Sequence, residues 1–244
     1  MLMTKESPLT RKLSAFVALS EVDLDTLARF HRRRRTFLPG HEMIHEGQPN
    51  ASAFILAEGW ALSYKILPDG ERQIVDVQIP GDFLGLRSVL FRTADHSIEA
   101  ATRIEASEVL ASDILDAFAH APRLATAVLW AASRDEAMVV EHLVNIGRRS
   151  AEERMAHFLL ELGARLMLVG LGDKTGYACP LTQYHLADAL GLSAVHVNRV
   201  LRHLRDDGLV TFQKGQVVFD DIDRLSELAG FDTGYLDQDG PVLR

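Results

Sequence analysis

Cysteine is almost missing from the chain, since Cys179 is the single thiol among 244 residues. One cysteine excludes an intramolecular disulfide framework, a four-cysteine zinc site and an all-cysteine iron–sulfur cluster, and it indicates a reducing, intracellular setting. Long apolar runs are missing too. Residues 119–132 are the most apolar region, yet His120, Pro122 and Arg123 interrupt it, and a membrane span needs about 18 consecutive apolar residues. The first 13 residues hold no apolar stretch that suits a signal peptide. We therefore expect a cytoplasmic protein without a membrane partner.

Positive charge is in deficit, with 26 Lys and Arg against 34 Asp and Glu and a net charge of −8. This balance argues against a wholly basic nucleic-acid coat but permits a local DNA-reading surface, because net charge averages over domains. Hydrophobic residues make up 47% and charged residues 25%, which excludes wholesale disorder. The length suits one large domain or two small ones.

The N-terminal half is predicted to be mainly β-structure. Residues 36–118 alternate strand-like runs with turn signals such as Pro39-Gly40, Pro68-Asp69-Gly70 and Pro80-Gly81. Turns that recur at roughly 8–12 residues are typical of a β-sandwich or barrel. Short helices are expected before it, at Leu9–Leu19 and Val22–Arg32. We take residues 1–118 as one domain.

Residues 119–149 are predicted to form one long helix. Pro122 suits its first turn, and its apolar stripe is Leu124, Val128, Ala131, Met138, His142 and Leu143. A helix of this length exceeds what a small β domain needs for cover, so we expect a homodimer seam; packing on its own barrel is the alternative. Ser150-Ala151-Glu152-Glu153 reads as a capping box that opens the next domain.

The strongest local pattern lies at 182–205. Thr182 can cap a helix over 183–190, Gly191 allows a left-handed turn, and Ser193 can cap a second helix to about Asp206. Leu209–Phe212 and Gln216–Phe219 then predict a two-stranded wing. The region 150–230 is thus predicted to be a winged helix-turn-helix that places its second helix in the major groove. Residues 231–244 are left as a C-terminal tail.

The DNA-binding residues follow from this geometry. Arg199 is the best candidate for base readout, because a guanidinium matches guanine O6 and N7. Phosphate contacts are expected from Thr182, Gln183, Arg202 and Lys214. The second helix also turns outward Ser193, Ala194, Val195, Asn198 and His203.

The order of β-roll, long helix and winged helix-turn-helix resembles the Crp/Fnr family of bacterial transcription regulators over about residues 10–230. Pro80-Gly81-Asp82-Phe83-Leu84-Gly85 and the stretch from Leu181 to Leu209 carry the resemblance. It implies an α+β fold with a cyclic-nucleotide-binding-like jelly roll. It also implies a non-enzymatic homodimer, held through 119–149, that binds a near-palindromic double-stranded DNA site and recruits or blocks RNA polymerase. Activation is the expected mode.

The departures from the family concern its ligand. Cyclic-AMP-binding members have Glu after the glycine of this turn and an Arg-Ser or Arg-Thr pair about ten residues later. Here Leu86 follows Gly85, and His96-Ser97 stands at the later pair. The positions of the implied pocket are Gly85, Leu86, Arg87, His96, Ser97, Val139 and Val140. Control by cyclic AMP is therefore not expected, and the cofactor is unknown.

Three alternatives remain open. The roll could bind a haem, gas or metabolite that gates DNA binding, the regulator could act without any effector, or the chain could be a metallohydrolase built on His41 and His45. His41-Glu42-Met43-Ile44-His45 matches the zinc-protease string, but on a strand the two histidines lie about 13 Å apart, too far to share one zinc ion, so no metal site is predicted. Cys179 is either a redox switch near the reading helix or an inert small residue.

Overall fold

The computed structural model describes residues 7–236, and these divide into two compact units. The first contains residues 7–65 and 76–136; the second contains 66–75 and 137–236. The boundary therefore falls within the long helix. Among the described residues no helix is both long and apolar enough to cross a bilayer.

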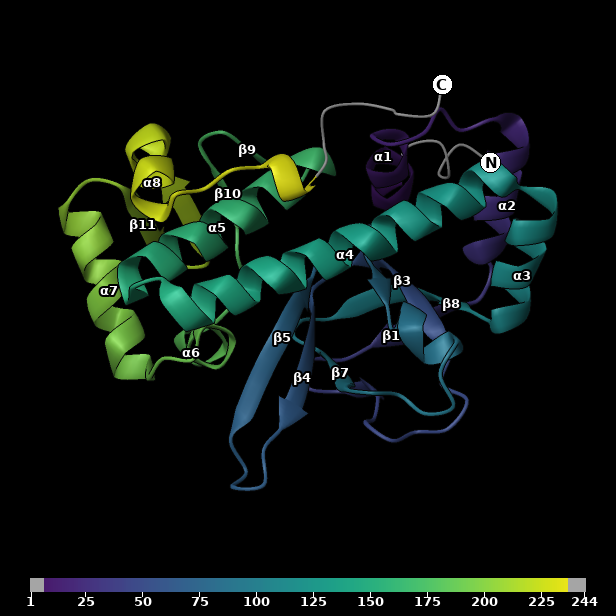
Figure 1. Ribbon diagram of the computed structural model, residues 1–244, viewed down its shortest axis with the longest axis horizontal. Helices are drawn as coiled ribbons and strands as arrows, with labels where there is room; N and C mark the ends of the chain where they lie inside the picture. The colour runs from purple at the N-terminus through teal and green to yellow at the C-terminus, as the bar shows by residue number, and fades with distance from the viewer. Residues whose placement is uncertain (1–6, 237–244) are drawn as a thin grey trace. The chain divides into compact units, whose positions relative to one another are not determined.

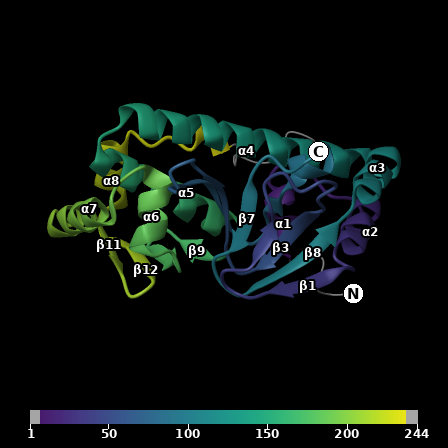
Figure 2. The ribbon, with the colours of Figure 1, turned by 90° about the horizontal axis from the view of Figure 1, so that it is seen from below.

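The first unit begins with two helices and a β-roll (Figures 1 and 2). Helices α1 (Pro8–Ser14) and α2 (Glu21–Phe30) lead into two sheets, whose strand orders are β1-β8-β3-β6 and β2-β7-β4-β5. The strands are β1 (Arg34–Phe37), β2 (Glu42–Ile44), β3 (Ala53–Glu58), β4 (Ala61–Ile66), β5 (Arg72–Gln78), β6 (Phe83–Leu84), β7 (Ser97–Ala100) and β8 (Ile104–Val109). Ile44, Leu56, Leu84 and Ile98 fill the apolar interior of the roll.

Two boundaries of this unit differ from the sequence prediction. Helix α1 ends at Ser14 rather than Leu19, because Val17 enters the core and Phe16 stacks on Trp130 at 5.1 Å between ring centroids. The last eight residues of the predicted strand region belong to α3 (Ala111–His120). This helix begins where the Asp113 carboxylate accepts the backbone N–H of Leu110 at 2.8 Å.

Helix α4 (Pro122–Arg148) confirms the predicted long helix, but the predicted dimer stripe is largely wrong. Leu124, Val128, Ala131 and Met138 are buried within the chain, and His142 is half-buried. The exposed apolar residues are Leu129, Val139, Val140, Leu143, Val144 and Ile146. Both faces of this helix are apolar, so the sequence alone did not separate the inner face from the outer one.

The second unit is built on α5 (Ala151–Leu168), which opens with the predicted capping box between Ser150 and Glu153. Helices α6 (Gln183–Leu190), α7 (Ala194–Asp206) and α8 (Ile222–Ala229) follow, with a sheet ordered β11-β12-β10-β9. Its strands are β9 (Gly172–Asp173), β10 (Gly176–Ala178), β11 (Val210–Gln213) and β12 (Gln216–Phe219). The end of the β4–β5 hairpin also belongs here, where Arg72 Nε donates to Asp188 Oδ2 on α6 at 2.8 Å.

Candidate nucleic-acid interface

Helices α6 and α7 form the predicted helix-turn-helix with the predicted bounds. The Thr182 side chain accepts the backbone N–H of His185, and Ser193 accepts that of His196, each at 3.2 Å. Between the helices Gly191 has φ of 62°, a left-handed conformation that glycine adopts without strain. Val197, Val200 and Leu204 are buried on the inner face of α7. These caps and core contacts hold α7 in place with its opposite face outward.

The outer face of α7 carries the predicted DNA-binding residues. Val195, Asn198, Arg199 and Arg202 are exposed there, and Ala194 is half-buried. Thr182, Gln183 and Ser193 are exposed at the N-terminal ends of the two helices. The structure thus places these residues on one surface around the start of α7, where a recognition helix contacts base edges.

Gln183 and Asn198 are bonded to each other across the two helices. The Asn198 amide donates to Gln183 Oε1 at 2.6 Å, and the Gln183 amide donates in return to Asn198 Oδ1. Both side chains are exposed. The pair therefore braces α6 against α7, and an amide that contacts DNA must do so from within this pair.

The wing presents Lys214 at its tip. Strands β11 and β12 pair up to Gln213 and Gln216, which leaves Lys214-Gly215 as a two-residue turn. Both turn residues have positive φ, 51° and 72°, as a type I′ hairpin requires. Lys214 is exposed on this tight turn, a position that suits a phosphate contact rather than base readout.

Two exposed groups near this surface were not singled out from the sequence. Tyr184 is exposed in the first turn of α6, and helical periodicity beside Gln183 could have indicated it. Glu152 of α5 accepts from His203 Nδ1 of α7 at 2.7 Å. The hydrogen bond and charge of Glu152 raise the pKa of His203. This pair ties the reading helix to α5, and no sequence spacing signals a contact between residues so far apart.

In the roll, the predicted pocket residues of the first unit lie around the turn at Gly85, which we call the filled turn because apolar side chains pack against it. Gly85 has φ of 65° and begins a short 3₁₀ helix at Leu86. A side chain at Gly85 would meet Ile44 Cδ1 at 2.4 Å, so apolar groups already occupy that space. Leu86 packs against the apolar cluster under the helices. Val139 and Val140 lie in the second unit, on the exposed surface of α4.

The polar members of the predicted pocket have internal partners. Asp95 accepts from His96 Nδ1 at 2.8 Å and forms an ion pair with Arg87 at 3.5 Å. The charges of His96 and Arg87 outweigh the effect of burial and lower the pKa of Asp95. The Ser97 hydroxyl accepts the backbone N–H of Glu46 at 3.0 Å.

Comparison with known proteins supports both halves of this description. Residues 34–121 match the family model of a cyclic nucleotide-binding domain, and residues 153–228 match that of a Crp-like helix-turn-helix domain. The nitrogen fixation regulation protein FixK of Bradyrhizobium diazoefficiens is 32% identical over 213 residues, 86% of this chain and 88% of that protein. A probable transcriptional activator of Rhizobium leguminosarum bv. viciae is also 32% identical, over 86% of this chain and 87% of that one.

The solved structure of FixK2 from Bradyrhizobium japonicum aligns with a TM-score of 0.73 and 28% identity, over 82% of this chain and 98% of that chain. This chain belongs to the Crp/Fnr family. It is a DNA-binding transcription regulator with a helix-turn-helix domain, and the predicted family and fold are confirmed. Because the family consists of transcription regulators, the prediction that the chain is not an enzyme is confirmed as well.

The roll of this Crp/Fnr regulator does not fit a cyclic nucleotide held in the way the family resemblance implies. Leu86 offers no acceptor for a ribose hydroxyl. The buried His96 ring is bonded to Asp95, and a histidine lacks the bidentate fork that grips a phosphate. At the zinc-protease string, His45 pairs with Glu42, the first residue of β2, and within residues 7–236 no group of three His, Cys, Asp or Glu side chains could hold a metal ion.

Proposed function

We propose that this regulator acts as a homodimeric transcription activator that binds a near-palindromic DNA site, contacts RNA polymerase and does not depend on cyclic AMP. Its relatives support activation, because one is named a probable transcriptional activator. The exposed face of α7, with Arg199 available for base readout, carries the proposal. Thr182, Gln183, Arg202 and Lys214 are proposed to contact phosphates around it, with Ser193, Ala194, Val195 and Asn198 completing the surface.

The exposed face of α4 supports the dimer. Leu129, Ala132, Glu136, Val139, Leu143 and Ile146 follow one another at spacings of three and four residues, the heptad pattern of a two-stranded coiled coil. Leu143 is 73% exposed and Leu129 is 54% exposed. Apart from Glu136 this seam is apolar, and a second copy of the same helix provides the matching pattern that would cover it.

The filled turn at Gly85 supports DNA binding without an effector. A ligand group at the Cβ position of Gly85 would have to displace Ile44 from the apolar interior, and a ligand held by His96 Nδ1 would have to break the Asp95–His96 bond. Both changes carry a free-energy penalty that ligand binding would have to offset. We therefore infer that the unliganded protein is competent to bind its site, and the effector-dependent alternative predicts instead that it is not.

Selection of bound sequences from a random duplex pool tests this function, with the purified, unliganded protein and an Arg199→Ala variant as control. We expect an enriched palindrome whose preference at one base pair per half-site is lost in the variant. If the unliganded protein enriches nothing, the proposal of effector-free competence is wrong. If it enriches a single half-site, the dimer is wrong.

Leu143→Glu tests the seam directly. A charge at this position should dissociate the dimer and lower affinity for a palindromic site by at least about 100-fold, because two linked half-sites lose their shared binding. Light scattering and DNA titration measure both effects. Leu115→Glu is the matched control, since Leu115 is 69% exposed on α3 outside the heptad pattern. A Leu143→Glu protein that remains dimeric would refute the α4 interface.

A further inference from the structure

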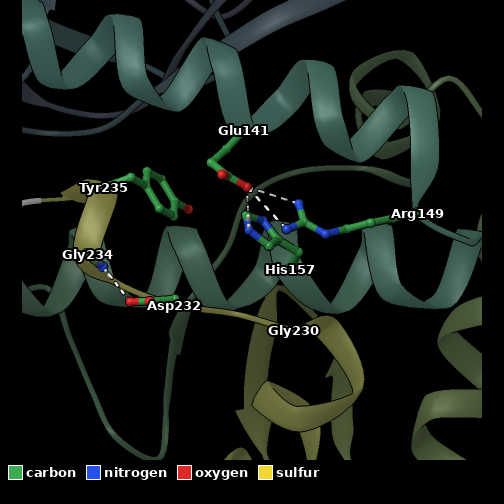
Figure 3. Close-up of a pocket in the computed structure, with 7 residues that line it drawn as sticks. All are labelled: Glu141, Arg149, His157, Gly230, Asp232, Gly234 and Tyr235. Carbon is green, nitrogen blue, oxygen red and sulfur yellow. Dashed lines mark hydrogen bonds and ion pairs between the residues drawn. The ribbon is translucent and has the colours of Figure 1, made fainter.

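The segment after α8 was left without a role by the sequence, yet its described part packs onto α5. Figure 3 shows Tyr235 lining a pocket together with Glu141, Arg149 and His157. The His157 ring contacts those of Phe231 and Tyr235 with centroids 5.1 and 6.0 Å apart. His157 is only 1% exposed, and the half-buried Phe231 and Tyr235 help to cover it, while Leu236 is itself buried in the second unit.

The Tyr235 hydroxyl donates a hydrogen bond to a buried carboxylate. The acceptor is Glu161 Oε2 of α5 at 2.7 Å, and Glu161 is 1% exposed. The other carboxylate oxygen, Oε1, is 2.9 Å from Nε2 of His142 on α4. Glu161 therefore joins three segments of the second unit: the end of α4, the middle of α5 and the C-terminal segment. We call Tyr235, Glu161 and His142 the clamp.

The negative charge of Glu161 in the clamp is compensated by its neighbours. Burial by itself raises the pKa of Glu161, but the charge and hydrogen bond of His142, the charge of Arg165 and the bond from Tyr235 lower it to about 2. On the far side of the His142 ring, Nδ1 faces the carbonyl oxygen of Val75 at 3.4 Å. A buried carboxylate that loses one of these partners is left with an uncompensated charge, so the contact resists separation.

The clamp lies away from the turn that connects the two helices. Near that turn, Arg149 Nη1 donates to Asn145 Oδ1 at 2.8 Å, and Arg154 Nη2 donates to the carbonyl oxygen of Ile146 at 3.0 Å. These bonds hold the turn itself. Glu161 lies about three helical turns further along α5, where a contact controls the angle between the two helix axes rather than the conformation of the connection.

This angle matters because the two helices carry different functions. The exposed face of α4 beside His142 contains Val139 and Leu143 of the proposed seam. Helix α5 carries the winged domain: Glu152 binds His203 of α7, and Gly163 lies so close to β12 that an added Cβ would meet the Phe219 ring at 3.0 Å. A change in the angle between α4 and α5 would move the reading helix relative to the seam.

We propose that Tyr235 is a positioning residue for DNA binding and that, through Glu161 and His142, it sets the half-site spacing that the dimer accepts. The inference rests on the proposed homodimer that reads a palindrome. In such dimers the distance between the two recognition helices determines the spacing of the half-sites. Tyr235 itself contacts no base or phosphate in this proposal.

Tyr235→Phe tests the clamp, because it removes the hydroxyl and keeps the ring packing. The selected palindrome is re-synthesised with its central spacer lengthened or shortened by one and two base pairs, and the full-length protein is titrated against each duplex. We expect the ratio of affinities between the preferred and neighbouring spacers to fall at least about threefold, as loss of a bond to a charged group predicts. Glu161→Gln should change this ratio in the same direction.

Tyr64→Phe is the matched control. Its hydroxyl donates to Glu42 Oε1 at 3.1 Å in the roll, so the same bond type is lost away from the clamp, and the spacer ratio should not change. Thermal unfolding of each variant verifies folding. If Tyr235→Phe weakens all spacers by one common factor, or changes none, the positioning role is overturned. If the wild-type protein shows no spacer preference, the palindrome-reading dimer is itself refuted, and the inference fails with it.

Discussion

The reading surface and the interior of the roll both contain polar residues, but they arrange them in opposite ways. On α7, Arg199 and Arg202 extend into solvent from a helix fixed by its caps. In the first unit, His96 of the roll and Lys12 of α1 are buried and bonded to aspartates of the roll. A polar group with a buried partner must break that bond before it can bind a ligand, whereas an exposed one only exchanges water. Residue type alone therefore does not identify a binding site.

The largest expected effect concerns the buried ion pair that joins α1 to the roll. Lys12 Nζ donates to Asp82 Oδ1 at 2.7 Å, and both side chains are almost fully buried. Lys12→Met removes this ammonium from the Asp82 carboxylate. The Asp135 carboxylate, 3.8 Å from the same ammonium, loses its attraction as well. We expect the free energy of unfolding to fall by about 3–5 kcal/mol, as measured by urea denaturation.

The double variant Lys12→Met/Asp82→Asn is the control for that experiment. It removes both charges, and the asparagine oxygen can still accept the backbone N–H of Ile79 that Asp82 Oδ2 accepts at 2.9 Å. Most of the lost stability should return. A single variant as stable as the wild type would show that the buried pair contributes little, and the contrast between the two regions would weaken.

Acid should destabilise the second unit through His157. Burial and the positive charge of Arg149 lower its pKa to about 4, below the ordinary value near 6.5 of an unfolded chain. Between these two values the unfolded chain binds the proton more tightly, so stability is complete above pH 6.5 and is lost as the pH falls toward 4. The shift corresponds to a loss on the order of 3 kcal/mol.

Urea unfolding at pH 7, 5.5 and 4.5, for wild type and His157→Gln, measures this loss. Burial also lowers the pKa of His31, so only the difference between the two proteins reports His157. The variant should start less stable at pH 7 and lose less on acidification. Parallel pH profiles for the two proteins would contradict a neutral, buried His157.

On the reading surface, the expected effects are smaller and separate by role. Arg199→Ala should make the free energy of DNA binding about 1–3 kcal/mol less favourable and relax the sequence preference at one base pair per half-site. Lys214→Ala should weaken binding to all sequences alike and reduce the salt dependence. Titrations against the selected site and a scrambled duplex at two salt concentrations measure both. Equal losses on both duplexes for Arg199→Ala would refute base readout.

The sequence predicts the helix-turn-helix to the residue because its signals are local. Thr182 and Ser193 cap their helices through bonds that span three residues, and Gly191 provides the left-handed turn between them. The same holds for Ser150, whose capping box opens α5. Where caps and turns are formed by neighbouring residues, spacing along the chain is sufficient.

Contacts between residues far apart in the chain could not be predicted from the sequence alone. The inner and outer faces of α4 are both apolar, so Leu124 could be distinguished from Leu143 only once the roll was in place. The Tyr235–Glu161 bond joins residues 74 positions apart, and an Asp- and Gly-containing tail gave no sign of it. Helix α3 was missed because no glycine or proline separates it from β8, its start depending on Asp113.

Cys179 should give the smallest effect, since the structure favours the inert alternative. It is buried beneath the wing, where its N–H donates to the carbonyl oxygen of Gly215 at 2.9 Å. Burial raises the pKa of its thiol to about 12, and a thiol that is not ionised is a poor nucleophile.

Cys179 in the native protein should therefore react with an alkylating reagent far more slowly than in protein unfolded in urea. The affinity for DNA should be unchanged after mild peroxide treatment. Cys179→Ala serves as the unreactive control. If peroxide abolishes DNA binding by the wild-type protein but not by Cys179→Ala, the redox switch is reinstated. That result would also show that the wing opens far enough to expose Cys179, a side chain buried as deeply as the polar groups of the roll.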